Sequence, residues 1–308
     1  MLSWKPWSFD GLVRLFVSVL ICSVFIGGVG VGVVSFFYAP HHESSWKFLA
    51  ASIGAIVCFL GGIVVLGRPR KSEKFVKHFI ALLVFVYVGF FLMWLAARLH
   101  GGPENREIGN TWKAVVVIFC FQGAALILVS RFLREQRMTW NEAFGLKNDT
   151  ARALLFGAVL GIGLFSIGGG LQVLSGWALE HLHHPAQEQT AVQVIRAAQS
   201  WPNRLVLGIA AVLIAPAAEE ILFRGLLYPT IKQAGYPRLA IWITALLFGA
   251  IHMNLATFIP LTVLALLLIW IYEKTGNLLA SITAHAVFNL INFLMLFVAE
   301  TFNRLPHP

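Results

Sequence analysis

The chain is built of long apolar runs separated by short polar connections. A helix needs roughly 20 apolar residues to cross about 30 Å of hydrocarbon. Nine candidate runs follow one another along the chain: Leu12–Tyr38, Phe48–Leu66, Phe79–Leu99, Ala114–Phe132, Ala153–Leu179, Leu205–Tyr228, Leu239–Met253, Leu255–Tyr272 and Leu278–Val298. The ends of the last four are blurred, because some are short and polar residues interrupt them. The pattern predicts an all-α, polytopic transmembrane helix bundle with eight or nine spans.

Composition supports the bilayer as the surrounding solvent. The chain is 58% hydrophobic and 12% charged, about half the charged fraction of a typical soluble domain. Cys22, Cys58 and Cys120 lie inside apolar runs, so we interpret them as packing residues and not as a disulfide framework. Glycine is frequent in the first, second and fifth runs, which predicts close helix packing.

Basic residues indicate how the chain is oriented. They cluster in alternate connections, at Arg68–Lys77, Arg131–Arg152 and Lys232–Arg238, whereas His41–Trp46 and Glu180–Gln199 are poorer in Lys and Arg. The positive-inside rule then predicts a protein of the inner or plasma membrane with a cytoplasmic N-terminus. The same rule accounts for the net charge of +9 without nucleic-acid binding.

Two further features concern organisation. The first apolar run is too long for a cleavable signal peptide, and no A-x-A-like site follows it. The polar stretch Trp140–Asp149 interrupts the apolar pattern and is expected at the cytoplasmic interface. It divides the chain into N-terminal helices of unassigned role, residues 1–139, and a C-terminal transmembrane core, residues 140–308.

The C-terminal half carries ionisable residues inside its apolar runs, where each costs at least about 2.5–3.5 kcal/mol. Glu220 and Arg224 are four residues apart and lie on one helix face, which predicts an internal ion pair. Glu219 is rotated by about 100° and is left without that partner. An unpaired carboxylate at low dielectric is suited to general acid or base chemistry.

Two other apolar helices contribute polar side chains. His252 follows Phe248 by one turn in one helix, and His285 and Asn289 are spaced by four in the last helix. A lone histidine on such a helix is more often a packed core residue. Glutamate, histidine and a His/Asn pair on three helices instead offer a base, a proton partner and hydrogen-bond donors. Glu219 and His285 are expected about 10–15 Å from the cytoplasmic helix ends, so the site is predicted to open to the cytoplasm.

Three motifs in this half resemble those of the CAAX protease and bacteriocin-processing family, also called CPBP or Abi proteins. They are EExxxR from Glu219 to Arg224, FxxxH from Phe248 to His252, and HxxxN from His285 to Asn289. The resemblance covers roughly Trp140 to Val298. It implies an intramembrane endopeptidase that acts on a membrane-associated peptide or protein. The signatures HExxH and GxSxG, of zinc and serine proteases, do not occur.

The resemblance also implies roles for the residues. Glu219 would activate water with help from His252, and His285 and Asn289 would form an oxyanion hole. Glu220 and Arg224 would hold the first motif together. Zinc is a second option, since two glutamates and two histidines could ligate it, although Asn289 beside His285 fits an oxyanion hole at least as well.

Two readings from other functional classes stay open at this point. A non-proteolytic membrane factor, such as a bacteriocin-immunity or scaffold protein, is consistent with the family resemblance. A transporter would predict internal repeats, and we find no convincing repeat between the halves. The sequence names no substrate, and prenylation of the substrate follows only from the name of the family.

Overall fold

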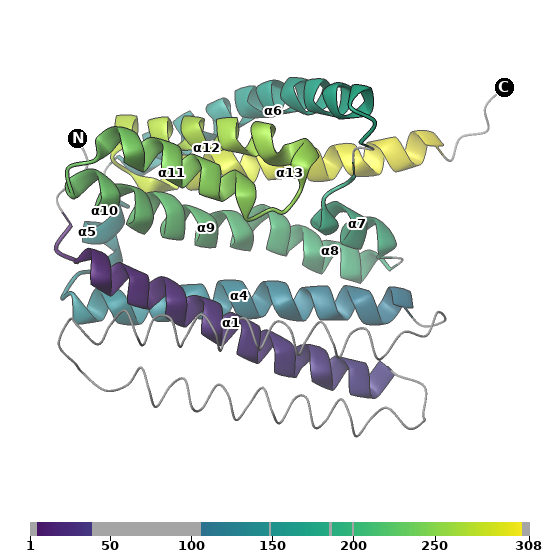
Figure 1. Ribbon diagram of the computed structural model, residues 1–308, viewed down its shortest axis with the longest axis horizontal. Helices are drawn as coiled ribbons and strands as arrows, with labels where there is room; N and C mark the ends of the chain where they lie inside the picture. Colours follow the sequence, from purple (N-terminus) through teal and green to yellow (C-terminus); the bar gives the residue numbers. More distant parts are fainter. Residues whose placement is uncertain (1–4, 39–105, 148, 185–186, 199, 304–308) are drawn as a thin grey trace. The chain divides into compact units, whose positions relative to one another are not determined.

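The computed structural model describes residues 5–38, 106–147, 149–184, 187–198 and 200–303 (Figure 1). In these ranges it contains helices and no strand, which confirms the predicted all-α class. The helices include α1 (Phe9–Tyr38), α4 (Arg106–Glu135), α5 (Trp140–Phe144), α6 (Thr150–His181), α7 (Thr190–Ala197), α11 (Pro237–Ala250), α12 (Leu255–Thr275) and α13 (Leu278–Asn303). The predicted runs Phe48–Leu66 and Phe79–Leu99, and the basic connection between them, lie outside the described residues.

The chain divides into two compact units. One comprises Met1–Leu15 together with Leu126–Pro308, and the other comprises Phe16–Ala125. All three motifs belong to the first unit, and so does the short segment that precedes α1.

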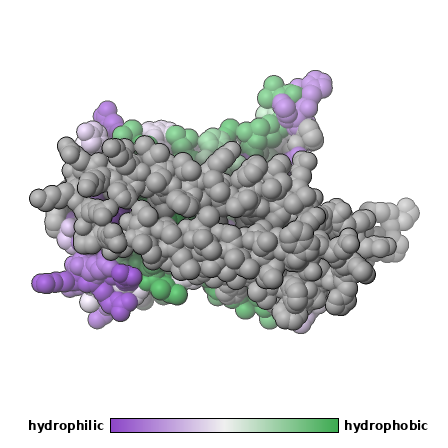
Figure 2. Space-filling model, turned by 60° about the horizontal axis from the view of Figure 1, so that its bottom comes forward, coloured by the Kyte–Doolittle hydropathy of each residue, from purple (hydrophilic) through white to green (hydrophobic). Residues whose placement is uncertain are grey.

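Five described helices are long and apolar enough to cross a membrane: Val115–Glu135, Thr150–His181, Trp201–Gln233, Leu255–Thr275 and Leu278–Val298. They coincide with five of the predicted runs. Their apolar side chains face outward as well as inward, and on α6 Leu155 and Val173 are 68% and 72% exposed. Figure 2 shows hydrophobic surface between hydrophilic patches where its view exposes coloured residues. This distribution is that of a multi-pass membrane protein.

Glycines allow α6 to pack closely along α13. A Cβ atom at Gly157 would lie 2.3 Å from the carbonyl oxygen of Ala280, and one at Gly161 would lie 2.7 Å from that of Ala284. Both contacts advance by four residues, so the two helices run in the same direction. The pair forms a GxxxG pattern, in which the missing side chains let backbones touch. The glycine-rich run therefore places the helix that carries His285.

The longest membrane helix, Trp201–Gln233, is not a uniform α-helix. It consists of α8 (Trp201–Ile209), the π-helix η2 (Ala210–Ile214), α9 (Ala215–Glu220), the π-helix η3 (Ile221–Leu227) and α10 (Tyr228–Gln233). Each π-helical segment ends two residues before a proline, Pro216 or Pro229. Proline lacks the N–H that an α-helix needs, and π-helical turns are common at functional sites. The helix also continues to Gln233, five residues beyond the predicted end.

α11 and α12 form an antiparallel hairpin. α11 has 14 residues and is therefore about 21 Å long, less than the thickness of the hydrocarbon layer. α11 ends at Ala250 because Met253 adopts a positive φ of 50° and Asn254 caps the start of α12. The turn between the two helices carries His252.

The segment before α1 packs onto the first unit. Lys5 is 3% exposed, and its ammonium donates to the carbonyl oxygen of Ala143 in α5. The indole of Trp7 donates to the Thr230 hydroxyl in α10 at 2.8 Å. This N-terminal strap, residues 5–7, therefore joins α5 to the end of the helix that carries both glutamates.

Candidate active site

The first motif forms the ion pair that its spacing predicts. Arg224 Nη1 lies 3.0 Å from Glu220 Oε1, and both side chains are fully buried. The guanidinium carbon is 4.4 Å from the centroid of the Phe248 ring. A buried arginine thus has a carboxylate on one side and an aromatic face on the other, the two kinds of partner that guanidinium groups favour.

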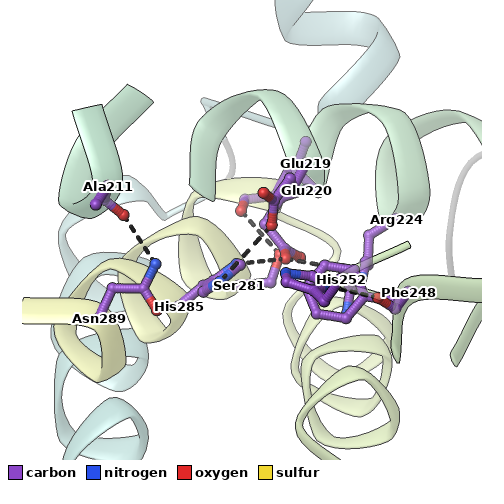
Figure 3. Close-up of polar contacts among 10 residues, drawn as sticks. Ala211, Glu219, Glu220, Arg224, Phe248, His252, Ser281, His285 and Asn289 are labelled. Carbon is purple, nitrogen blue, oxygen red and sulfur yellow. Dashed lines mark hydrogen bonds and ion pairs between the residues drawn. The ribbon is translucent and has the colours of Figure 1, made fainter. Parts of the chain in front are cut away.

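His285 joins this pair across the helix interface. Its Nδ1 lies 3.0 Å from the same Glu220 Oε1, and its Nε2 lies 3.9 Å from Glu219 Oε2 (Figure 3). Glu219 is 19% exposed by side chain and Glu220 is 0% exposed. The two adjacent carboxylates therefore differ: one is buried and engaged by two cationic or donor groups, and the other is accessible and faces an imidazole nitrogen.

Phe248 and His252 lie beside this group. The Phe248 ring is 5.0 Å from the His252 ring and 5.7 Å from the His285 ring, centroid to centroid. His252 Nδ1 lies 2.7 Å from the backbone carbonyl oxygen of Phe248. Because a carbonyl oxygen can only accept, Nδ1 must carry the hydrogen, and in the neutral ring the lone pair is on Nε2. His252 therefore presents an accepting nitrogen.

Asn289 binds the backbone and is not directed at the two glutamates. Its Nδ2 donates to the carbonyl oxygen of Ala211 in η2 at 2.8 Å (Figure 3). The residue five places after Ala211 is Pro216, which has no N–H, and the N–H of Ala215 already donates to Ala210. The Asn289 amide supplies the missing donor, and the same nitrogen carries a second N–H.

A zinc site requires at least three suitably placed donors. Among the residues that the structure describes, no three His, Cys, Asp or Glu side chains are grouped so that they could hold a metal ion. Glu220 is also committed to Arg224 and His285. The described donor set in this arrangement does not fit zinc.

The structure thus brings Glu219, Glu220, Arg224, Phe248, His252 and His285 together, with Asn289 one turn beyond His285. The contact of Glu220 with His285 was not predicted. A spacing of four residues identifies partners on one helix, whereas a contact between residues 65 apart depends on how α9 and α13 pack. Nothing local in the sequence signals that contact.

The geometry defines a membrane-embedded helical protein with a carboxylate–imidazole site between helices. Residues 201–291 match the family model described as "Type II CAAX prenyl endopeptidase Rce1-like". This match confirms the resemblance seen in the three motifs, all of which lie within the matched segment.

Curated relatives cover parts of the chain. The UPF0177 protein YxdF of Lactococcus lactis subsp. lactis (strain IL1403) is 28% identical over 104 residues, which are 33% of this chain and 55% of the relative. The uncharacterized protein YpbD of Bacillus subtilis (strain 168) is 35% identical over 83 residues, 26% of this chain and 40% of the relative. The chain spans about half the length of the curated relatives that it matches. No solved structure matches the chain.

Proposed function

We propose that this protein is an endopeptidase that hydrolyses a peptide bond of a membrane-associated substrate with a water molecule activated by Glu219. The observation that supports this most directly is the difference in burial and in partners between the two adjacent glutamates. Glu220 is buried against Arg224, while Glu219 is partly exposed and faces His285. The exposed carboxylate is the one that water and substrate can reach.

In the proposed reaction, Glu219 accepts a proton from water as its oxygen attacks the carbonyl carbon of the substrate. The second Asn289 N–H would donate to the oxyanion that develops, and so would His285 Nε2 once the ring carries hydrogen on both nitrogens. Collapse of the tetrahedral intermediate breaks the C–N bond, and the leaving nitrogen takes up the proton that Glu219 received from water, directly or through His252. The products are a carboxylic acid and an amine, which leave as a carboxylate and an ammonium when the acid passes its proton to the amine.

The Glu219→Gln variant tests the proposal, because glutamine keeps the size of the side chain and removes the base. Purified protein is assayed with prenylated and membrane-inserted peptide libraries, with and without a metal chelator. We expect the cleavage rate to fall by about 10²- to 10⁴-fold, the usual contribution of a general base.

The matched control is Glu135→Gln, which removes an exposed carboxylate of the Arg131–Glu135 pair on α4. It should cleave as fast as the unaltered protein. Equal turnover by Glu219→Gln would refute the proposed mechanism, and the absence of any cleavage by the unaltered protein would favour a non-proteolytic role.

A further inference from the structure

We propose that Glu220 is a positioning residue that holds the His285 imidazole in the tautomer with hydrogen on Nδ1 and directs Nε2 toward Glu219. The inference rests on the proposed function and deepens it. It gives Glu220 a role beyond the ion pair with Arg224, and it couples the first motif to the third through one hydrogen bond.

The geometry of the shared oxygen supports this role. Glu220 Oε1 is 3.0 Å from both Arg224 Nη1 and His285 Nδ1. Because arginine stays protonated in proteins, Glu220 pairs with it as a carboxylate, which can only accept hydrogen bonds. The hydrogen of that contact must then belong to His285 Nδ1. The opposite nitrogen, Nε2, faces Glu219 Oε2 at 3.9 Å.

The ion pair is a poor stabiliser, so stability alone does not explain it. Glu220 Oε2 and the Nε and Nη2 nitrogens of Arg224 are buried without a hydrogen-bond partner among the described residues, and Nη1 contacts Glu220 Oε1 as an ion pair. Buried pairs of this kind can often be replaced by apolar residues without loss of stability, because desolvation offsets the attraction. A role in orienting His285 gives the pair a function that apolar side chains cannot supply.

The consequence for catalysis follows from the fixed ring. A carboxylate that accepts from one imidazole nitrogen sets the orientation of the ring and leaves the other nitrogen toward the reacting groups. In other hydrolases, loss of the correct tautomer lowers kcat by as much as about 10⁴-fold. His285 can meet the substrate or Glu219 only through Nε2, so its alignment depends on Glu220.

Two variants separate positioning from simple ion pairing. Glu220→Met/Arg224→Met removes both charges and the acceptor for His285 Nδ1, whereas Arg224→Met removes the ion pair and keeps the Glu220 carboxylate as that acceptor. An amide at position 220 is unsuitable, because in other hydrolases an amide in place of such a carboxylate leaves the ring in the wrong tautomer. We expect kcat to fall at least about 100-fold in the double variant, with KM little changed, and to fall at least about tenfold less in Arg224→Met. Equal kcat values in the two variants would overturn the inference.

The control variant Lys232→Met/Glu273→Gln removes an ion pair that joins α10 to α12 outside the site. It should keep its kcat. Thermal unfolding of all variants checks that each is folded.

Nitrogen-15 NMR of the His285 ring, assigned by difference from His285→Gln, tests the inference without activity. At a pH where the ring is neutral, the unaltered protein and Arg224→Met should carry hydrogen on Nδ1, and the Glu220→Met/Arg224→Met variant should shift hydrogen to Nε2. Hydrogen on Nε2 in the unaltered protein would refute the role of Glu220. If the NMR result holds and no peptide is cleaved, the proposed function fails and the positioning contact stands.

Discussion

At the scale of single residues, side chains of the same type have different surroundings because they point in different directions from their helices. Glu219 and Glu220 are neighbours, yet the first is partly exposed and the second fully buried. Asn289 and Asn292 are likewise close in sequence. Asn292 donates to the Phe288 carbonyl of its own helix from an exposed position, whereas Asn289 crosses to Ala211 of another helix.

The Asn289→Ala variant tests this difference. It leaves the Ala211 carbonyl without the donor that Pro216 cannot supply, and an unsatisfied partly buried carbonyl costs about 1–3 kcal/mol. We expect lower stability in denaturant unfolding and slower cleavage. Asn292→Ala is the matched control, because the same residue type on the same helix makes an exposed local bond. Equal losses in the two variants would contradict the role given to Asn289.

At the scale of helices, close packing and local distortion place the site. Gly157 and Gly161 set the distance between α6 and α13, and two prolines accompany the π-helical segments on either side of α9. The contact between His285 on α13 and Glu220 on α9 depends both on the packing of α13 against α6 and on the course of the helix through α9.

The Gly161→Ala variant tests the packing of α6 on α13. Its new methyl group would lie 2.7 Å from both the Ala284 carbonyl oxygen and the Val287 Cβ, so α13 must shift next to His285. Overpacking of this kind costs about 1–3 kcal/mol, and we expect reduced thermal stability and reduced cleavage. Gly163→Ala is the control, since nothing lies within 4 Å of its new methyl group. If the two variants have the same thermal stability and the same cleavage rate, the close contact of Gly161 with α13 does not position His285.

The N-terminal strap predicts a pH dependence of stability. Burial lowers the pKa of Lys5 from 10.5 to about 8. Between these values the unfolded chain binds more protons than the folded one, so the free energy of unfolding should increase as pH rises through this window. Relative to Lys5→Met, the gain is up to roughly 3 kcal/mol.

Unfolding by denaturant at pH 7, 8, 9 and 10.5 measures this difference. Lys147→Met, at an exposed lysine between α5 and α6, controls for the loss of one positive charge. The free energies of unfolding of the unaltered protein and of Lys5→Met are compared at each pH. If their difference stays constant across the window, Lys5 has the same pKa in the folded and in the unfolded chain, which contradicts the prediction.

At the scale of the whole molecule, the distribution of apolar helices and of charges at the helix ends is that expected of a protein in a bilayer. Five of the described helices are long and apolar enough to cross a membrane. The basic residues Lys147 and Arg152 lie just before and within the first turn of α6, whereas Glu180 lies in its last turn. The positive-inside rule predicts that the start of α6 is cytoplasmic.

Cysteine labelling in intact cells tests this orientation. With the three native cysteines replaced, Glu180→Cys should react with a membrane-impermeant maleimide and Arg152→Cys should react only after the cells are opened. Both positions are exposed on the protein surface, so failure to react reports the side of the membrane. The reverse pattern would refute the predicted orientation.

The sequence by itself determined the features that depend on local periodicity. Apolar run length predicts the helices, because one solvent, hydrocarbon, demands about 20 apolar residues in each span. Spacing by four predicted the Glu220–Arg224 ion pair and the placement of His285 and Asn289 on one face. These relations follow from the geometry of a single helix.

Only the tertiary structure decided which of these helices meet and through which atoms. Contacts between different elements hold the candidate site together: Glu220 with His285, the Phe248 ring with Arg224 and His285, and Asn289 with the Ala211 carbonyl. The π-helical segments also lay beyond the sequence pattern, because a proline can kink a helix in several ways. The ionisable residues in apolar helices marked where the site is, and helix packing determined that Glu219 is the accessible carboxylate.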